Sequence, residues 1–403
     1  LFVSNSIWEN LDIIQMPQLN VVCHVDSLLI LYMRRGKLAN IPDLVDRLFA
    51  RRYPHNLTFE DIHFHSEAPE ELAMLSYTSG TSGFSKGVMI PYRALWSNAR
   101  FGMDHIEALK PGKEVISILP MAHMYGLAFE VLTEVCCGVH IHFLGRTPGP
   151  RVIADAFHKF HPSLIVAVPL VLEKIVRKKV FPILQKPQYK LLLHVPVLRK
   201  RIFRTVCKKL EESLGNNFYE VIVGGAALSS DVEHFLHEGG FRYTTGYGMT
   251  ECAPLISYAP WNTFKEGSVG RPIERMSVRI DSVDPHKTVG EIQVKGDNVM
   301  LGYYNNEEAT KQIFTDDGWL RTGDLGTMDA DNNIFIRGRS KNMILGANGQ
   351  NIYPEEIEDQ LNALPYVAES LVVSRDDKLI ALIHPDLELM DGNGLSVQEI
   401  RPI

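Results

Sequence analysis

The stretch from Leu75 to Arg93 reads LSYTSGTSGFSKGVMIPYR and decides the fold of this 403-residue chain. Apolar residues from Leu72 to Leu75 predict a strand that ends near Tyr77, and Val88 to Ile90 predict a second strand. The residues between them are almost all Thr, Ser, Gly or Lys: Thr78, Ser79, Gly80, Thr81, Ser82, Gly83, Phe84, Ser85 and Lys86. Glycines let backbone N–H groups turn towards one point, and hydroxyl groups add donors. We therefore expect this loop to cradle a polyphosphate, with Lys86 supplying a compact positive charge.

This loop differs from the common phosphate loop of kinases and ATPases. That pattern has Gly directly before its lysine and Ser or Thr directly after it. Here Ser85 precedes Lys86 and Gly87 follows, and the next residues read as strand and turn rather than helix. A flexible Gly/Ser linker is also disfavoured, because two apolar strands flank the loop and it carries one central lysine.

Bulk properties narrow the class of protein. The chain is 45% hydrophobic and 22% charged, which is ordinary for a globular protein, and its length predicts more than one domain. The net charge of −7 argues against general nucleic-acid binding. Five cysteines without paired metal-ligand spacing fit a reducing compartment, so we expect a cytoplasmic protein. The longest apolar run, Leu164 to Leu172, is too short to span a bilayer.

Strands and helices alternate through most of the chain, which predicts an α/β fold. Strand-like runs end in chemically distinctive residues. The run from Glu114 to Leu119 leads into a Pro- and His-containing loop, and the run from Phe218 to Val223 ends in Gly-Gly-Ala-Ala. Another run leads into Gly246-Tyr247-Gly248-Met249-Thr250-Glu251. Ligands bind at the carboxyl ends of strands in such sheets, so we expect functional loops at these positions.

Over about 262–336 the sequence consists of short runs of alternating apolar and polar residues separated by turn residues. This pattern predicts a small antiparallel barrel or sheet. It contains Thr322-Gly323-Asp324 and is followed by Gly338-Arg339-Ser340-Lys341. Further on, Pro354 and the acids behind it form a good helix start.

The wording Ser-Gly-Thr-Ser-Gly-x-Ser-Lys-Gly resembles the phosphate loop of the adenylate-forming enzymes, which include acyl-CoA synthetases, luciferases and adenylation domains of peptide synthetases. Gly-Tyr-Gly-Met-Thr-Glu, Thr-Gly-Asp and Gly-Arg-x-Lys follow in the family's order, so the resemblance covers nearly the whole chain. It implies a large ATP- and acyl-binding domain over 1–338 with mixed and parallel sheets, whose β-rich part is about 262–336. A small mobile α+β domain begins at 339 and runs to 403. The chain begins with Leu1, and we expect both ends to be incomplete.

The resemblance also assigns roles to residues. The candidate catalytic residues are Lys86, His123, Thr250, Glu251, Arg339 and Lys341. The candidate nucleotide-binding residues are Thr78, Ser79, Gly80, Thr81, Ser82, Gly83, Lys86, Gly225, Ala226, Ala227, Tyr247, Gly248, Met249, Thr250, Asp324, Arg339 and Gly349. The candidate Mg²⁺ ligands are Glu251 and Thr78, since hard cations prefer oxygen.

Within these sets, each residue type suits its expected task. The ring of Tyr247 suits stacking on adenine, and Thr250 offers a hydroxyl to the α-phosphate. The carboxylate of Asp324 suits both ribose hydroxyls, as in the family. By resemblance, His123 lies beside the carboxylate substrate and Lys341 is a hinge. The alternatives are a structural histidine for His123 and an ordinary turn residue for Asp324. For Thr250 and Glu251 the alternative is a capped turn at the start of a helix.

The activity that the resemblance implies has two steps, with ATP, Mg²⁺ and coenzyme A. A carboxylate, which we expect to be a long-chain fatty acid, attacks the α-phosphorus of ATP, and the thiol of coenzyme A then displaces AMP. Alternatives are an aryl or amino acid substrate, transfer to a carrier-protein thiol, and a nucleotide-binding scaffold without turnover. The family's C-terminal catalytic lysine has no counterpart after His384, and without it we expect adenylation to fall roughly a hundredfold or more.

Residues 171–209 are strongly basic. They hold twelve Lys or Arg residues and one acid, Glu173, interleaved with apolar residues. Such a segment fits peripheral contact with an anionic membrane at its cytoplasmic face, and it also fits the solvated face of a helical hairpin.

Overall fold

The computed structural model describes residues 1–34, 41–78, 85–144, 149–345, 351–364, 366–375, 378–387 and 390, without the side chains of 41–45, 150 and 190. The chain separates into two compact units, Leu1–Ser66 and Glu67–Ile403. The first unit contains a three-stranded sheet and two helices: β1 (Phe2–Val3), α1 (Asn5–Trp8), β2 (Val21–His24), β3 (Ile30–Met33) and α2 (Ile41–Arg52). Every candidate site residue belongs to the second unit.

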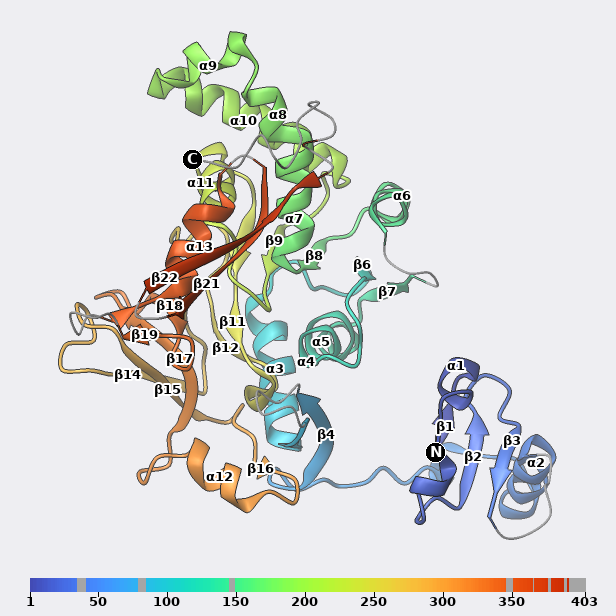
Figure 1. Ribbon diagram of the computed structural model, residues 1–403. Helices are drawn as coiled ribbons and strands as arrows, with labels where there is room; N and C mark the ends of the chain where they lie inside the picture. Colours follow the sequence, from blue (N-terminus) through green and yellow to red (C-terminus); the bar gives the residue numbers. More distant parts are fainter. Residues whose placement is uncertain are drawn as a thin grey trace. The chain divides into compact units, whose positions relative to one another are not determined.

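A five-stranded parallel sheet forms the centre of the second unit (Figure 1). Its strands are β6 (Glu114–Ser117), β7 (His140–Phe143), β8 (Leu164–Ala167), β9 (Glu220–Val223) and β10 (Tyr243–Thr245). They lie in the order β10-β9-β8-β6-β7, so the chain moves from β6 to β7 on one side and then to β8 on the other. The sheet therefore has a topological switch point between β6 and β8, where α/β sheets bind ligands.

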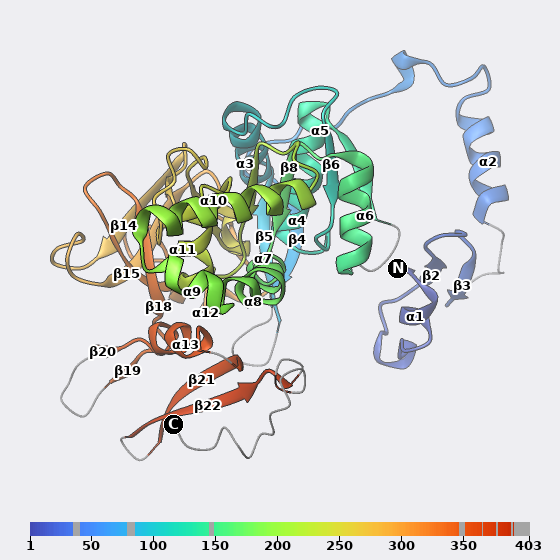
Figure 2. The ribbon, with the colours of Figure 1, turned by 90° about the horizontal axis from the view of Figure 1, so that it is seen from above.

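Helices connect these strands and cover the sheet. They are α4 (Met124–Leu127), α5 (Thr133–Cys137), α6 (Pro150–Phe160), α7 (Pro169–Ile175), α8 (Phe181–Leu184), α9 (Pro187–Leu193), α10 (Pro196–Ser213) and α11 (Ser230–Gly239). Helix α10 lies beside α11 (Figures 1 and 2). The α/β class predicted from the alternation is confirmed.

Successive residues of the central strands contribute to two different hydrophobic cores. Val115, Leu164 and Val166 belong to one core, together with α3 and the antiparallel strands. Their neighbours Ile116 and Ile165 belong to the other, together with α6, α7, α10 and α11. Because side chains alternate across a strand, the sheet is buried on both faces, which explains why its strands read as continuous apolar runs.

The predicted strands around the phosphate loop are β4 (Leu72–Thr78) and β5 (Lys86–Pro91), which pair antiparallel with Thr78 opposite Lys86. A distant strand, β16 (Gly302–Tyr303), pairs with the other edge of β5. Helix α3 (Tyr92–His105) follows directly. It ends at His105, because Ile106 takes an extended conformation while its N–H still bonds the Gly102 carbonyl.

The β-rich region contains a four-stranded antiparallel sheet in the order β14-β15-β17-β18. Its strands are β14 (Met276–Asp281), β15 (Gly290–Gly296), β17 (Leu320–Met328) and β18 (Ile334–Arg339). Around it lie β11 (Tyr247–Gly248), β12 (Leu255–Tyr258), β13 (Arg271–Pro272) and α12 (Glu307–Ile313). The predicted antiparallel character is confirmed.

The last part of the chain contains a short strand pair, a helix and a long hairpin (Figure 2). They are β19 (Ile344–Leu345), β20 (Asn351–Ile352), α13 (Pro354–Asn362), β21 (Val367–Arg375) and β22 (Lys378–Pro385). Pro354 starts α13 as predicted, with Glu355 in its first turn. That carboxylate accepts hydrogen bonds from Asn342 at 2.7 Å and from the Arg339 N–H at 3.3 Å, so α13 is joined to the end of β18. The division into domains at 338 and 339 stays a prediction.

Candidate active site

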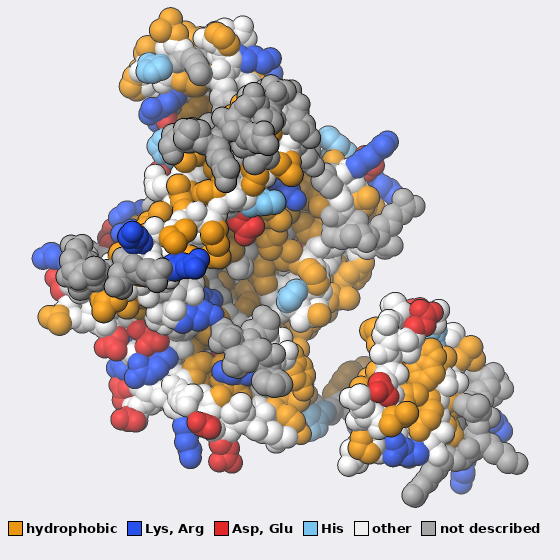
Figure 3. All heavy atoms as spheres, in the orientation of Figure 1, with side chains coloured by type: hydrophobic (Ala, Val, Ile, Leu, Met, Phe, Trp, Pro, Cys, Tyr) orange, Lys and Arg blue, Asp and Glu red, His pale blue; other side chains and the backbone are white. Residues whose placement is uncertain are grey.

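A cavity of about 700 Å³ opens at the carboxyl ends of the central strands. Residues directly after four of the five strands line it: Leu119 and Pro120 after β6, Val168 after β8, Gly224 and Gly225 after β9, and Gly246 after β10. In the space-filling view, hydrophobic side chains predominate around a hollow in this unit (Figure 3). The cavity therefore lies where the switch point of the sheet places a ligand site.

Glu251, Tyr303 and Lys86 form a linked group in the cavity wall. The Tyr303 hydroxyl donates to Oε1 of Glu251 at 2.8 Å, and both side chains are buried. The Lys86 ammonium stands 4.8 Å from the centre of the Tyr303 ring, a cation–π distance. Pairing of β16 with β5 puts Tyr303 there, because it places the residue opposite Val88.

Asp324 is the centre of a second group. Its Oδ2 accepts the Tyr247 hydroxyl at 2.6 Å, and its Oδ1 lies 2.9 Å from Nε of Arg339. The pKa of Asp324 is raised by burial, although the Tyr247 hydroxyl and the charges of Arg339 and Lys341 act in the opposite direction. A buried carboxylate with two fixed partners is rigid and keeps lone pairs for further donors.

The loop that carries Glu251 is tightly held. A Cβ on Gly248 would lie 2.1 Å from the carbonyl oxygen of Pro254, which precedes β12, so only glycine fits at this position of β11. The side-chain amide of Asn98, from α3, accepts the Leu255 N–H at 3.0 Å and donates to the Cys252 carbonyl at 3.4 Å. The position of Glu251 is therefore set by backbone contacts as well as by its own hydrogen bond.

Gly224 and Tyr125 meet where β9 ends. The Tyr125 hydroxyl donates to the Ile222 carbonyl at 3.1 Å, and its ring lies so near Gly224 that a Cβ there would approach it to 3.0 Å. The predicted His123 is exposed, lines the same cavity and precedes α4. This end of the cavity is thus formed by the Tyr125 ring, the glycine backbone at Gly224 and the His123 imidazole.

Glu130 fixes the loop that leads to His123. It is buried, and it accepts hydrogen bonds from the Leu119 N–H at 2.8 Å, the Ile118 N–H at 3.1 Å and the Ser117 hydroxyl at 3.0 Å. Burial raises its pKa to about 7, and these three donors act in the opposite direction. The carboxyl end of β6 is therefore tied to the helix behind it.

The structure brings most of the predicted site residues together. Those that line the cavity are Thr78, Lys86, His123, Gly225, Tyr247, Gly248, Met249, Thr250, Glu251 and Arg339. Asp324 bonds two of them, while Lys341 is exposed in the turn after β18. Ala226 and Ala227 are exposed beside the cavity and do not line it. Ser79, Gly80, Thr81, Ser82, Gly83 and Gly349 lie outside the described residues.

Sequence reasoning missed Tyr303, Tyr125 and Glu130 as parts of the site. Tyr303 stands in a Gly-Tyr-Tyr run whose only local signal is an aromatic pair after a glycine. Tyr125 and Glu130 lie within five residues of each other behind the His123 loop. Their proximity to a predicted functional loop was the available signal.

Comparisons with known proteins agree with this geometry. The AMP-binding enzyme family matches residues 31–304, and the chain belongs to that family. The long-chain-fatty-acid–CoA ligase FadD15 of Mycobacterium bovis is 32% identical over 380 residues, covering 87% of this chain and 60% of the ligase. A long-chain-fatty-acid–CoA ligase of Escherichia coli O6:H1 is 31% identical over 313 residues, covering 76% of this chain and 50% of the ligase. The chain thus spans about half to three fifths of these two ligases.

Solved structures share the fold. ATP-bound MatB from Rhodopseudomonas palustris aligns with a TM-score of 0.71 and 25% identity, covering 98% of this chain and 72% of that one. The O-succinylbenzoate coenzyme A synthetase MenE of Bacillus subtilis, in complex with ATP and magnesium ion, aligns with a TM-score of 0.68 and 24% identity, covering 94% and 68%. The predicted adenylate-forming family and its fold are confirmed.

Proposed function

We propose that this protein activates a carboxylic acid with ATP, forming an acyl-adenylate and pyrophosphate, and then transfers the acyl group to the thiol of coenzyme A. The observation that supports this proposal is the convergence of Lys86, Glu251 and Arg339 on one cavity at the switch point of the sheet. Asp324 is paired with Arg339 in the wall of this cavity. Two cations and two carboxylates, each held by a neighbour, suit the triphosphate, the ribose and the charge that develops at the α-phosphorus.

In the first step the protein positions and neutralises rather than reacts covalently. Arg339 and Lys86 offset the negative charge of ATP, while Thr250 offers its hydroxyl to the α-phosphate. Asp324 accepts hydrogen bonds from the ribose hydroxyls, with its carboxylate already oriented by Tyr247. A carboxylate oxygen of the substrate acid attacks the α-phosphorus of ATP as the bond between this phosphorus and pyrophosphate breaks.

A magnesium ion fits this cavity. Glu251 and Thr78 offer the carboxylate and hydroxyl oxygens that Mg²⁺ prefers, and the Tyr303 hydroxyl fixes one oxygen of that carboxylate. When bound, the ion would neutralise phosphate charge.

In the second step the thiol sulfur attacks the acyl carbon and AMP leaves. We place the hinge for the rotation between the two steps at Lys341, which follows β18 in an exposed turn. Residues 339–403 would then turn relative to 1–338 and bring the segment around Gly349 to the cavity. This division of the chain rests on the family resemblance.

A long-chain fatty acid is the substrate that we propose. The cavity wall includes the apolar side chains of Phe101, Ile106, Phe129 and Ile313, and the matched relatives are named long-chain-fatty-acid–CoA ligases. His123 lies where the carboxylate end would bind. The competing substrates are an aryl or an amino acid, and a carrier-protein thiol is the competing acceptor.

Pyrophosphate exchange into ATP across acetate, octanoate, palmitate, benzoate and amino acids tests this substrate class in the full-length protein. We expect exchange that depends on added acid and is fastest with palmitate. Exchange only with benzoate or an amino acid would keep the chemistry and contradict the fatty-acid substrate. The absence of exchange with every acid would favour a nucleotide-binding scaffold.

Peripheral membrane contact is proposed for residues 171–209. Hydrophobic and basic side chains lie side by side over α9 and α10 (Figure 3). Leu191 and Val197 are 78% and 77% exposed, and Lys200, Arg204 and Lys208 are exposed along α10. Exposed apolar anchors beside cations favour an anionic lipid surface. Among the described residues, none of the helices has the length and hydropathy needed to cross a membrane.

Cosedimentation with phosphatidylserine-containing vesicles tests this contact. The double change Leu191→Ser and Val197→Ser should reduce binding without altering pyrophosphate exchange. The matched control is Val283→Ser, because Val283 is a fully exposed apolar residue outside this segment. Equal sedimentation of all three proteins would refute membrane contact through 171–209.

A further inference from the structure

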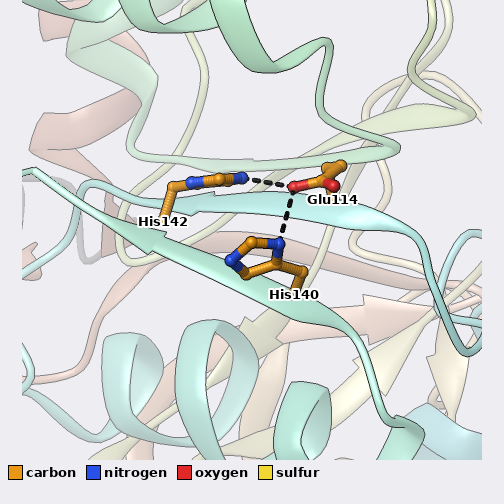
Figure 4. A group of neighbouring side chains, drawn as sticks. All are labelled: Glu114, His140 and His142. Atoms are coloured by element: carbon orange, nitrogen blue, oxygen red, sulfur yellow. Dashed lines mark hydrogen bonds and ion pairs between the residues drawn. The ribbon is translucent and has the colours of Figure 1, made fainter.

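Three metal-ligating side chains meet on the central sheet, outside the cavity (Figure 4). Oε2 of Glu114 lies 3.3 Å from Nδ1 of His140 and is also in hydrogen-bonding contact with Nε2 of His142. One ligand atom from each of the three lies within 4.8 Å of the other two. The proposed reaction uses none of them.

The sheet itself creates this convergence. Glu114 begins β6 and lies directly opposite His140, which begins the edge strand β7. His142 follows two positions later, so both imidazoles are on the same face of β7. Since β6 and β7 are parallel, this cluster lies towards their amino ends, whereas the cavity lies at the carboxyl ends. The cluster is therefore separate from the candidate active site.

The donor set has the chemistry of a transition-metal site. Two imidazole nitrogens and a carboxylate oxygen suit Zn²⁺ and its neighbours, whereas Mg²⁺ and Ca²⁺ prefer oxygen alone. In a tetrahedral zinc site with bonds of about 2.0–2.1 Å, ligand atoms lie about 3.3–3.5 Å apart. The separation of His140 from Glu114 already has that value, and the closer His142 contact would open to it with an ion between them.

Of the two imidazoles, that of His142 is packed against neighbouring residues and that of His140 is exposed to solvent. His142 stacks on Phe160, at the end of α6, with ring centres 3.7 Å apart, and its side chain is only 17% exposed. The His140 side chain is 65% exposed, so water can complete the coordination of an ion there. The ammonium of Lys159 stands 4.8 Å from the centre of the Phe160 ring, on which His142 stacks.

We propose that Glu114, His140 and His142 form a binding site for a divalent transition metal of the zinc class. Its ligands come from two adjacent strands, so an ion there would link the edge strand β7 to β6. A carboxylate–imidazole hydrogen bond without metal is the competing reading, and it makes a different prediction for binding.

Calorimetric titration of the full-length protein with Zn²⁺, in millimolar Mg²⁺ to occupy oxygen-rich sites, tests the proposal. We expect one Zn²⁺ per chain, and a parallel titration with Co²⁺ should give the visible absorption of tetrahedral nitrogen and oxygen ligation. His140→Ala and Glu114→Gln should each weaken Zn²⁺ binding at least ~10-fold, since even changes behind the ligands have effects of that size. The exposed His140 lets that variant fold normally, which circular dichroism checks.

His234→Ala is the matched control, because His234 is another exposed histidine beside carboxylates, Glu238 and Glu266. It should leave Zn²⁺ affinity and Co²⁺ absorption unchanged. Unaltered binding in both His140→Ala and Glu114→Gln, loss of binding in His234→Ala, or no Zn²⁺ binding by the unmodified protein would each overturn the site.

Discussion

Glu134 should lower the stability of this protein as the pH rises from about 5 to about 8. It lies on α5, is 1% exposed, and neither of its carboxylate oxygens bonds another described residue. Burial raises its pKa from the usual 4.5 to about 8, its own backbone N–H acts in the opposite direction, and the charge of Glu130 raises it further. The native state therefore favours the protonated form.

The sign and size of the effect follow from this shift. Because the folded pKa is raised, the stabilising contribution is fully present below about pH 4.5 and is lost as the pH rises through about 8. Each pKa unit corresponds to about 1.4 kcal/mol, so the loss between pH 5 and pH 8 is roughly 3–4 kcal/mol. Glu134→Gln stays neutral throughout and should escape this loss.

Urea unfolding at pH 5 and pH 8, followed by far-ultraviolet circular dichroism, measures the difference. The variant should gain roughly 3–4 kcal/mol over the unmodified protein between the two pH values. Glu212→Gln is the matched control, because it removes an exposed carboxylate on α10 and should leave the difference in stability between the two pH values unchanged. Parallel pH dependence in Glu134→Gln and the unmodified protein would refute the reasoning.

Three further changes probe the site and its support. Tyr303→Phe removes the hydroxyl that orients the buried Glu251 carboxylate and should lower kcat/KM for ATP roughly tenfold. The control Tyr304→Phe, at an exposed position, should leave kcat/KM unchanged, and equal effects of the two changes would contradict this role of Tyr303. Asp324→Asn should raise the Kd for AMP by roughly tenfold or more in calorimetry, and an unchanged Kd would remove Asp324 from the nucleotide site. Gly248→Ala drives a Cβ to 2.1 Å from a backbone carbonyl oxygen and should destabilise by about 3 kcal/mol or more, whereas Gly149→Ala, with nothing within 4 Å, should lower the melting temperature little.

The local elements were largely predictable from the sequence. Apolar runs with turn residues at their ends predicted β4, β5, β6 and β9 within a few residues. Strands β6 and β9 belong to the parallel sheet that is buried on both faces, so each of them reads as a continuous apolar segment. The loops that follow the parallel strands were expected to be functional, and the structure places several of them at one cavity, since parallel strands have their carboxyl ends along one edge.

The partners of the site residues were not predictable, because they depend on distant pairing. Tyr303 reaches Glu251 only when β16 joins β5, more than 200 positions earlier in the chain. Asp324 meets the Tyr247 hydroxyl across 77 positions. No local pattern encodes such contacts, since register between distant strands is set by the whole packed core.

In the proposed metal site, too, one part was visible in the sequence and the other depends on strand pairing. A His-x-His spacing is visible in the sequence at 140 and 142, but its carboxylate comes from the preceding strand, 26 positions before His140. Only the parallel register of β6 and β7 brings Glu114 to it.

Detection of the acyl-adenylate itself tests the central claim most directly. The full-length protein would be incubated with ATP, Mg²⁺ and palmitate, without coenzyme A, and the quenched mixture analysed by mass spectrometry. We predict palmitoyl-AMP in amounts near the enzyme concentration, and its disappearance with release of AMP when coenzyme A is added. The absence of both palmitoyl-AMP before and AMP after the addition of coenzyme A, or the formation of ADP instead, would contradict an adenylate-forming enzyme.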